Sequence, residues 1–215
     1  KRLKRNKICG LALDIDETLS FTIGCLVERL SKDIGNPENL TAREVFLKYR
    51  VTQNAPCWQN KEAEKIVDEI INSDKLQRDL PLIENANDLV AKINKIIPIV
   101  AYITARPSLI RNGTEFWLKK HGFVKAPVIL RPKGINKREG TKWKSKVLQY
   151  LYPEVSAIVD DNPSLVRWLV KSKIYKGKVF LYENLEFKSD NQNIIPCKDW
   201  NNVLKQIKKN CKRVK

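Results

Sequence analysis

Three short apolar runs of the sequence each end in side chains that can carry out chemistry. Residues 8–13 lead into Asp14 and Asp16, residues 97–103 into Thr104, and residues 157–159 into Asp160 and Asp161. Short runs that are apolar throughout are typical of parallel strands covered on both faces. Active sites of such sheets lie beyond the carboxyl ends of the strands, so we expect these side chains to meet at one edge.

Aspartates that gather at one edge of a sheet need a cation between them. Their mutual repulsion raises their pKa values unless a metal ion neutralises the charge. An all-oxygen set of Asp14, Asp16, Asp160 and Asp161 favours Mg²⁺, which commonly binds a few carboxylates together with a substrate phosphate. A carboxylate beside that ion can attack phosphorus and form an aspartyl-phosphate. Asp16, two residues after Asp14, is then placed to protonate the leaving oxygen and to activate water.

The phosphoryl group itself needs hydrogen-bond donors. We expect Thr104 and the backbone N–H groups near Ile15 and Ala105 to hold its oxygens. Thr18 and Arg106 are further candidates for substrate binding. For Arg106, an ion pair with a local acid explains the residue equally well.

A lysine is expected to balance this acidic site. Lys142, Lys144 and Lys146 lie in one expected helix, and all three are candidates. The apolar residues of that segment (Trp143, Val147, Leu148 and Leu151) form a stripe that leaves position 144 on its flank. We therefore expect Lys144 to supply the positive charge, with Lys142 as the alternative.

The rest of the sequence alternates strands with helices, which predicts a doubly wound α/β fold. Further strands are expected at residues 127–130 and 178–182, and helices at 84–95, 114–121, 142–150, 163–171 and 198–211. Residues 21–80 contain no convincing strand. They hold two helical stretches instead, one opened by a capping box at Thr41 and Glu44 and one by Asn60. We predict a core of residues 1–20 and 81–215 with a helical insertion at 21–80.

The residues that carry the chemistry resemble motifs I to IV of the haloacid dehalogenase (HAD) superfamily. The resemblance rests on residues 11–19 (LALDIDETL), 101–104 (AYIT), a later lysine, and 158–161 (IVDD). It implies a Rossmann-like doubly wound parallel sheet with a small helical cap inserted after the first strand. It also implies that Asp14 is the nucleophile, Asp16 the acid/base and a metal contact through its carbonyl, and Thr104 the phosphoryl-binding residue. By the same likeness Asp161 is the direct metal ligand, and Asp160 supports it and the lysine.

Other chemistries of that superfamily fit the residues less well. Its dehalogenases lack the second aspartate, so Asp16 argues against carbon–halogen cleavage. Its P-type ATPases carry threonine there and span membranes, whereas no apolar run here approaches the roughly 20 residues of a bilayer-spanning helix. A phosphatase or phosphomutase remains, expected in the cytoplasm and away from membranes. Five scattered cysteines without close pairing agree with a reducing compartment.

The charge of the chain bears on the substrate. The formal net charge is +17, and residues 119–149 hold ten Lys and Arg against one acid, Glu139. A basic loop at residues 131–138 is expected at the catalytic edge, where it favours a polyanionic substrate, although lysines on solvated faces explain the same charge. We expect a small phosphorylated metabolite as substrate. A nucleotide or a 3′ end of a nucleic acid is the alternative, and a binding protein without turnover is a third interpretation.

Overall fold

The computed structural model describes residues 9–211, and its central feature is a six-stranded sheet. Residue 8, where the first expected strand begins, lies outside this range. The strands are β1 (Gly10–Leu13), β2 (Ile99–Pro107), β3 (Val128–Arg131), β4 (Val155–Asp160), β5 (Lys178–Leu181) and β6 (Ile194–Pro196). They are all parallel and lie in the order β3-β2-β1-β4-β5-β6. The predicted doubly wound parallel sheet is therefore confirmed.

Two strands differ from their prediction. β2 continues to Pro107 instead of ending at residue 103, so Thr104 lies within the strand and not after it. Its pairing with β3 becomes irregular between Thr104 and Pro107, which brings this part of β2 to the edge where the neighbouring strands end. β6 was not predicted, because its three residues are too few to give a periodic signal.

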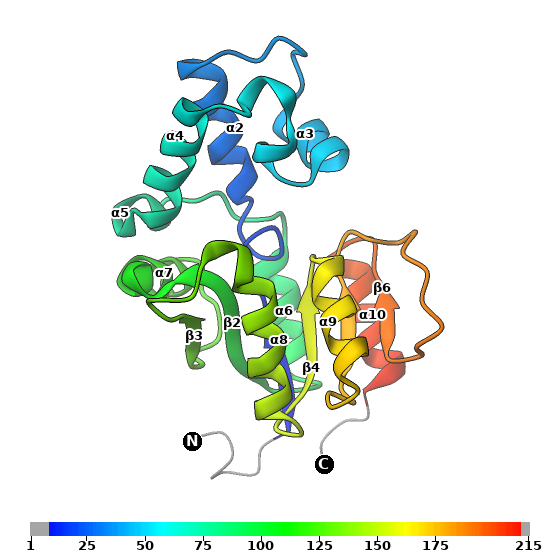
Figure 1. The fold of residues 1–215 in the computed structure, drawn as a ribbon. Helices are drawn as coiled ribbons and strands as arrows, with labels where there is room; N and C mark the ends of the chain where they lie inside the picture. The colour runs from blue at the N-terminus through cyan, green and yellow to red at the C-terminus, as the bar shows by residue number, and fades with distance from the viewer. Residues whose placement is uncertain (1–8, 212–215) are drawn as a thin grey trace.

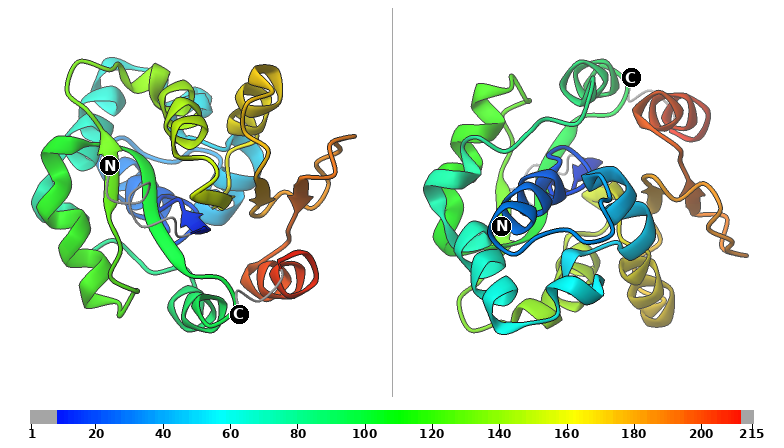
Figure 2. Two further views of the ribbon diagram at one scale, coloured as in Figure 1. Left: turned by 90° about the horizontal axis from the view of Figure 1, so that it is seen from below. Right: turned by 90° about the horizontal axis from the view of Figure 1, so that it is seen from above.

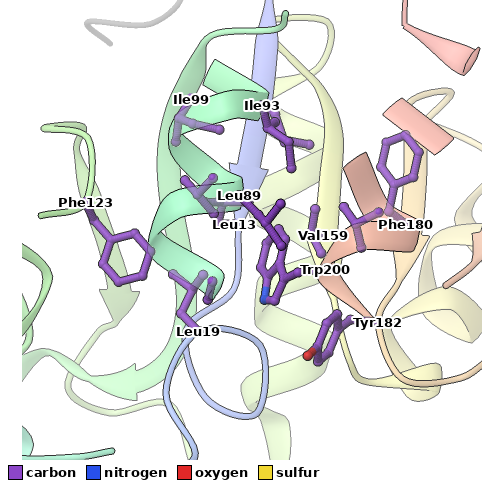
Figure 3. Close-up of a cluster of buried hydrophobic side chains, with 14 of the residues drawn as sticks. Leu13, Leu19, Leu89, Ile93, Ile99, Phe123, Val159, Phe180, Tyr182 and Trp200 are labelled. Atoms are coloured by element: carbon purple, nitrogen blue, oxygen red, sulfur yellow. The ribbon is translucent and has the colours of Figure 1, made fainter. Parts of the chain in front are cut away.

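Helices cover both faces of the sheet (Figures 1 and 2). One face carries α6 (Ala86–Asn94), α7 (Arg111–Lys120) and α10 (Trp200–Asn210), and the other carries α8 (Gly140–Leu151) and α9 (Pro163–Ser172). Side chains alternate along β1, so that Leu11 and Leu13 pack in the first layer and Ala12 in the second. Figure 3 shows the first layer, where Leu13 lies close to Leu89 of α6 and Trp200 of α10.

A group of four helices lies above the sheet, and the last and shortest of them packs against α7 of the core (Figure 1). It comprises α2 (Thr22–Asp33), α3 (Ala42–Tyr49), α4 (Lys61–Asn72) and α5 (Asp74–Gln77), with short 3-10 turns at Thr52–Asn54 and Pro56–Trp58. We call residues 22–77 the helical unit. Its apolar side chains form their own core, in which Leu30, Phe46 and Trp58 are almost fully buried. The predicted capping box of Thr41 and Glu44 opens α3, whereas α2 was not predicted.

The chain enters and leaves the helical unit at one place. The backbone N–H of Phe21 donates to the carbonyl of Pro81 (2.8 Å), and that of Ile83 donates to the carbonyl of Leu19 (2.8 Å). An antiparallel bridge joins Ser20 to Leu82 between them. We call this pairing of residues 19–21 with 81–83 the stem. It fixes both ends of the helical unit directly beyond β1.

The helices are short. The longest within residues 9–211 are α2, α4 and α8, with 12 residues each. A helix that crosses a bilayer needs about 20 apolar residues. None of the helices in the described part of the chain is long and apolar enough for that.

Candidate active site

Lys144 lies between two buried aspartates at the carboxyl edge of the sheet. Its Nζ is 2.8 Å from Oδ1 of Asp14 and 2.8 Å from Oδ2 of Asp160. The side chains of Lys144, Asp14 and Asp160 are 5%, 7% and 0% exposed, so water screens these ion pairs very little. Lys142, the alternative, is exposed, and its Nζ lies 5.3 Å from the centre of the Trp168 ring. Of these two lysines, only Lys144 can act on the aspartates.

The sheet delivers the two aspartates side by side. Asp14 directly follows β1 and Asp160 is the last residue of β4, and the N–H of Asp14 donates to the carbonyl of Val159 (3.0 Å). β1 and β4 flank the point where the strand order reverses, which is where ligands bind in sheets of this kind. Lys144 reaches them from the first turns of α8. This helix starts at Gly140, where an added Cβ would lie only 3.1 Å from that of Ala105.

Asp161 completes an acidic cluster with Asp14 and Asp160. One carboxylate oxygen from each of the three lies within 4.8 Å of the others. Asp160 is already engaged, because it pairs with Lys144 and accepts a hydrogen bond from the N–H of Asn162 (3.0 Å). Asp14 and Asp161 are therefore the carboxylates with most capacity left for a metal ion.

The electrostatics of this cluster call for a further cation. Burial raises the pKa of Asp14 to about 7 against the opposing charge of Lys144, and Asp160 adds to the rise. Burial and the charges of Asp160 and Asp14 also raise the pKa of Asp161 well above its usual value. One lysine thus does not compensate three carboxylates. A divalent cation that prefers oxygen ligands fits this donor set, and Mg²⁺ is such an ion.

The carboxylate of Asp16 lies apart from this cluster and is held by Arg106. The Nη2 and Nε of Arg106 donate to Oδ1 of Asp16 at 2.8 and 3.1 Å, and Nε lies 3.0 Å from Oδ2. The hydroxyl of Thr22 donates to the same carboxylate at 2.6 Å. Burial favours the neutral acid, but the Arg106 guanidinium outweighs it and holds the pKa of Asp16 below its usual value. Of the two interpretations of Arg106, the structure places it in an ion pair.

The remaining predicted substrate contacts are placed differently. Thr104 is fully buried, and its hydroxyl accepts the N–H of Arg106 (3.2 Å). Ala105 follows it and lines a cavity next to Asp16. Thr18 is also fully buried, but it does not line that cavity. Its carbonyl accepts a hydrogen bond from the indole of Trp200 (2.9 Å).

Two residues near the site were not predicted. Asn184 donates to the carbonyl of Asp161 (2.7 Å) and accepts from Nη2 of Arg50 (3.3 Å), so it connects the acidic cluster to the helical unit. It follows β5, and inspection of that strand end would have found it. Glu17 has a left-handed backbone (φ 54°), and its Oε1 accepts the N–H of Ile23 (2.6 Å). Burial raises the pKa of Glu17 to about 8. In the sequence, only its position next to Asp16 could have marked it as a site residue.

A cavity of about 290 Å³ opens between the helical unit and the sheet edge. Asp16, Ala105 and Arg106 form part of its wall, whereas Asp14, Asp160 and Asp161 do not line it. The cavity thus adjoins the Asp16 side of the site, and we call it the Asp16 cavity. A molecule bound in this cavity would contact Asp16 but not the three aspartates of the acidic cluster.

Comparison with known sequences gives a partial match. A family model described as the LNS2 domain of PITM 1-3 matches residues 67–162, which is less than half of the chain. The matched segment runs from α4 through the end of β4 and includes Lys144 and Asp160. No curated protein sequence matches the chain.

Solved structures resemble the chain over almost its whole length. A haloacid dehalogenase-like hydrolase from Streptococcus pneumoniae superposes with a TM-score of 0.53 at 14% identity, covering 94% of this chain and 99% of that one. A HAD-superfamily hydrolase from Ehrlichia chaffeensis gives 0.50 at 14% identity over 94% and 98%. The HAD hydrolase YfnB from Bacillus subtilis, solved with magnesium bound, gives 0.50 at 12% identity over 93% and 98%. At these identities the likeness concerns the fold.

Proposed function

We propose that this chain, which has the fold of the HAD-superfamily hydrolases, is a Mg²⁺-dependent phosphatase acting through an aspartyl-phosphate on Asp14. The observation that carries the proposal is the placement of Lys144 at 2.8 Å from both Asp14 and Asp160, with Asp161 beside them. A purely structural ion pair would not need a third carboxylate at the same point. Three carboxylates around one lysine at the reversal of strand order suit an anionic group bound together with a metal ion.

The proposed reaction has two halves. In the first, a carboxylate oxygen of Asp14 bonds to phosphorus, the bond from phosphorus to the leaving oxygen breaks, and that oxygen takes a proton from Asp16. For this step Asp16 must be protonated, and the negative charge of the bound phosphate favours that form against the effect of Arg106. In the second, a water oxygen bonds to phosphorus, Asp16 takes the proton of that water, and the bond to Asp14 breaks to release phosphate. Arg106 and Thr22 hold the carboxylate of Asp16 in position in both halves.

The remaining residues stabilise charge. Asp14, Asp161 and the backbone carbonyl of Asp16 would hold Mg²⁺, which supplies positive charge to the phosphoryl oxygens. Lys144 keeps Asp14 oriented and partly neutralised, and Asp160 anchors Lys144. Thr104 and the backbone near Ala105 are proposed to bind the phosphoryl group.

We assign the role of a cap to the helical segment of residues 21–80. The support is its position over the sheet edge and its direct contacts with the core. Arg43 of α3 forms an ion pair with Glu183, which follows β5 in the sequence. Lys137, which follows β3, lies 3.5 Å from Asp68 of α4. Lys137 also lines the cavity beside Asp16, so the cap is placed to enclose the leaving group there.

The proposal is tested by assaying a panel of phosphate monoesters with Mg²⁺ and with EDTA. Asp14→Asn should abolish turnover, and Asp88→Asn, an exposed and equally conservative change on α6, should not affect it. Acid-quenched wild-type protein should carry one phosphoryl group on the peptide that contains Asp14, as read by mass spectrometry. Absence of turnover on the whole panel, or equal rates for the two variants, would refute the proposal.

One observation supports the alternative substrate, which is a nucleotide or a 3′-phosphorylated nucleic-acid end. Arg131, Lys137 and Arg138 of the basic loop line a hollow that continues from the Asp16 cavity along the cap. A 3′-phosphorylated oligonucleotide belongs in the same panel for this reason. Binding that weakens steeply with added salt, together with faster turnover than that of small esters, would favour this alternative. Binding without turnover of any ester would favour a non-catalytic role.

A further inference from the structure

The walls of the Asp16 cavity differ in chemistry. The helical unit contributes an apolar surface formed by Ile23 and Leu26 of α2, Val51, and Val67 and Ile71 of α4, beside several polar side chains. Ile23 and Val67 also belong to the core of the helical unit, so this wall is held in place from behind. A ligand that enters the cavity therefore meets a fixed apolar surface on the cap side.

The opposite wall contains a cation without an acidic partner. Arg131, the last residue of β3, donates from Nε to the carbonyl of Ala105 (3.0 Å) and from Nη1 to the carbonyl of Ile135. Within residues 9–211 no carboxylate lies within ion-pair distance of its guanidinium. The two carbonyls fix its orientation but leave its charge uncompensated, and partial burial lowers its pKa because the charged form is less well solvated.

The other cations of the cavity are less suited to anchor a ligand. Lys137 faces Asp68 at 3.5 Å, and its side chain is 49% exposed. Arg50 bonds to Asn184 and lies over the ring of Phe46 at 5.0 Å. Arg106 is paired with Asp16, and Arg50, which has no carboxylate partner among the described residues either, is exposed. Of the cations that line the cavity, Arg131 is thus the half-buried one that the protein holds in place without a carboxylate partner. It lies on the same cavity as Asp16, where the leaving group of the proposed reaction would be.

We infer that the substrate is a phosphate monoester whose leaving group combines an apolar body with a second anionic group, and that Arg131 binds this second group. This rests on the proposed function, because the scissile phosphate is taken to lie at Asp14. The apolar body packs against α2 and α4, and a carboxylate or second phosphate meets the guanidinium of Arg131, which suits bidentate binding of either. The cavity itself, of about 290 Å³, has room for a small leaving group.

The test uses alkyl phosphates with and without a second anion. Hexyl phosphate, its analogue with a terminal carboxylate, and the corresponding bisphosphate are titrated by calorimetry into Asp14→Asn protein with Mg²⁺, and kcat/KM is measured on the unchanged chain. We expect both doubly anionic ligands to bind about tenfold more tightly than hexyl phosphate, as a charge-assisted contact supplies. Hexyl phosphate should in turn bind more tightly than ethyl phosphate, by about fourfold per methylene that reaches the apolar wall.

Variants then locate the effect. Arg131→Gln, combined with Asp14→Asn for calorimetry, should remove most of the preference for the second anion. Lys133→Gln removes an equal charge from the same loop. Because Lys133 lines neither the Asp16 cavity nor its continuation, this variant should still prefer the doubly anionic ligands. The ligand comparison on the unchanged Arg131 background does not depend on whether Arg131→Gln folds.

The outcomes separate this inference from the function beneath it. Equal affinity for hexyl phosphate and both doubly anionic ligands, or a preference that survives Arg131→Gln, overturns the subsite even if the esters are hydrolysed. A preference that depends on Arg131, without turnover of any compound, supports the subsite and refutes the phosphatase. Tighter binding of a 3′-phosphorylated oligonucleotide than of both doubly anionic ligands overturns the inference in favour of a nucleic-acid substrate.

Discussion

Replacing Lys144 by methionine tests the electrostatics of the site most directly. The change keeps a long apolar side chain but removes the cation that lies 2.8 Å from both Asp14 and Asp160. Removing one partner of a buried ion pair costs about 3–5 kcal/mol, because it leaves an uncompensated buried charge. Here two carboxylates lose their partner together, and both side chains are under a tenth exposed.

Proton uptake limits that cost. The pKa of Asp14 is already raised to about 7, and without Lys144 it should rise further, so Asp14 becomes neutral instead of remaining an isolated anion near neutral pH. We therefore expect the lower part of the range, about 3 kcal/mol of unfolding free energy. This is a large share of the roughly 5–15 kcal/mol that stabilises an ordinary domain.

The assay is urea unfolding at neutral pH in EDTA, followed by tryptophan fluorescence and circular dichroism. Lys142→Met is the matched control, because Lys142 lies on the same helix but only faces the Trp168 ring, a contact of about 0.5–1 kcal/mol. Adding Asp160→Asn to Lys144→Met should restore part of the loss, since one of the stranded carboxylates is removed. Equal stabilities of Lys144→Met and Lys142→Met would refute the reasoning.

Two further predictions concern protonation. The folded-state pKa of Asp14, about 7, lies above its ordinary 3.8, so the folded protein binds one more proton than the unfolded chain between these pH values. In EDTA, the wild type should therefore lose stability relative to Asp14→Asn as the pH rises from 3.8 to about 7. Saturating Mg²⁺ should abolish that loss. Equal pH slopes for the two proteins in urea titrations would contradict it. His121, the single histidine, packs on Trp117 with ring centres 4.6 Å apart, and burial and Lys120 lower its pKa below 6.5. The stability that neutral His121 contributes should therefore fall as the pH drops from 6.5 towards its lowered pKa. A midpoint at or above 6.5 in a proton NMR titration of His121 would disprove the shift.

The parts of the site that the sequence predicts are those set by local pattern. Asp14 and Asp160 follow short apolar runs, and such runs become parallel strands whose ends coincide, so their meeting needs no further information. The sequence pattern places Lys144 on the flank of an apolar stripe, but it lies on the buried face of its helix with Ser145 and Leu148. Its charge is tolerated there because Asp14 and Asp160 pair with it. For the two aspartates the deciding residues lie within a few positions of the functional one, whereas the placement of Lys144 depends on both of these distant carboxylates.

What the sequence left open depends on distant partners. Arg106 binds Asp16, 90 residues away, and Ser20, 86 residues away, and no local pattern shows which of two acceptable roles it takes. The first helix of the helical unit, α2, went unpredicted because no side chain caps its start at Phe21. Its buried apolar residues, Ile23, Leu26, Val27 and Leu30, nevertheless follow the helical period, so the pattern for this helix was present in the sequence. Tertiary contacts therefore decided the role of Arg106.

The stem has a consequence for how the two bodies of the protein can vary. Because residues 19–21 pair with 81–83, the ends of the inserted segment are held at adjacent positions whatever lies between them. The entropy of closing such a loop grows only with the logarithm of its length, by about 0.6 kcal/mol for each doubling. An insert of another length or sequence would therefore leave the backbone at the end of β1 in nearly the same position. Leaving-group recognition can be rebuilt at this junction while the strands that hold Asp14 and Asp160 keep their register.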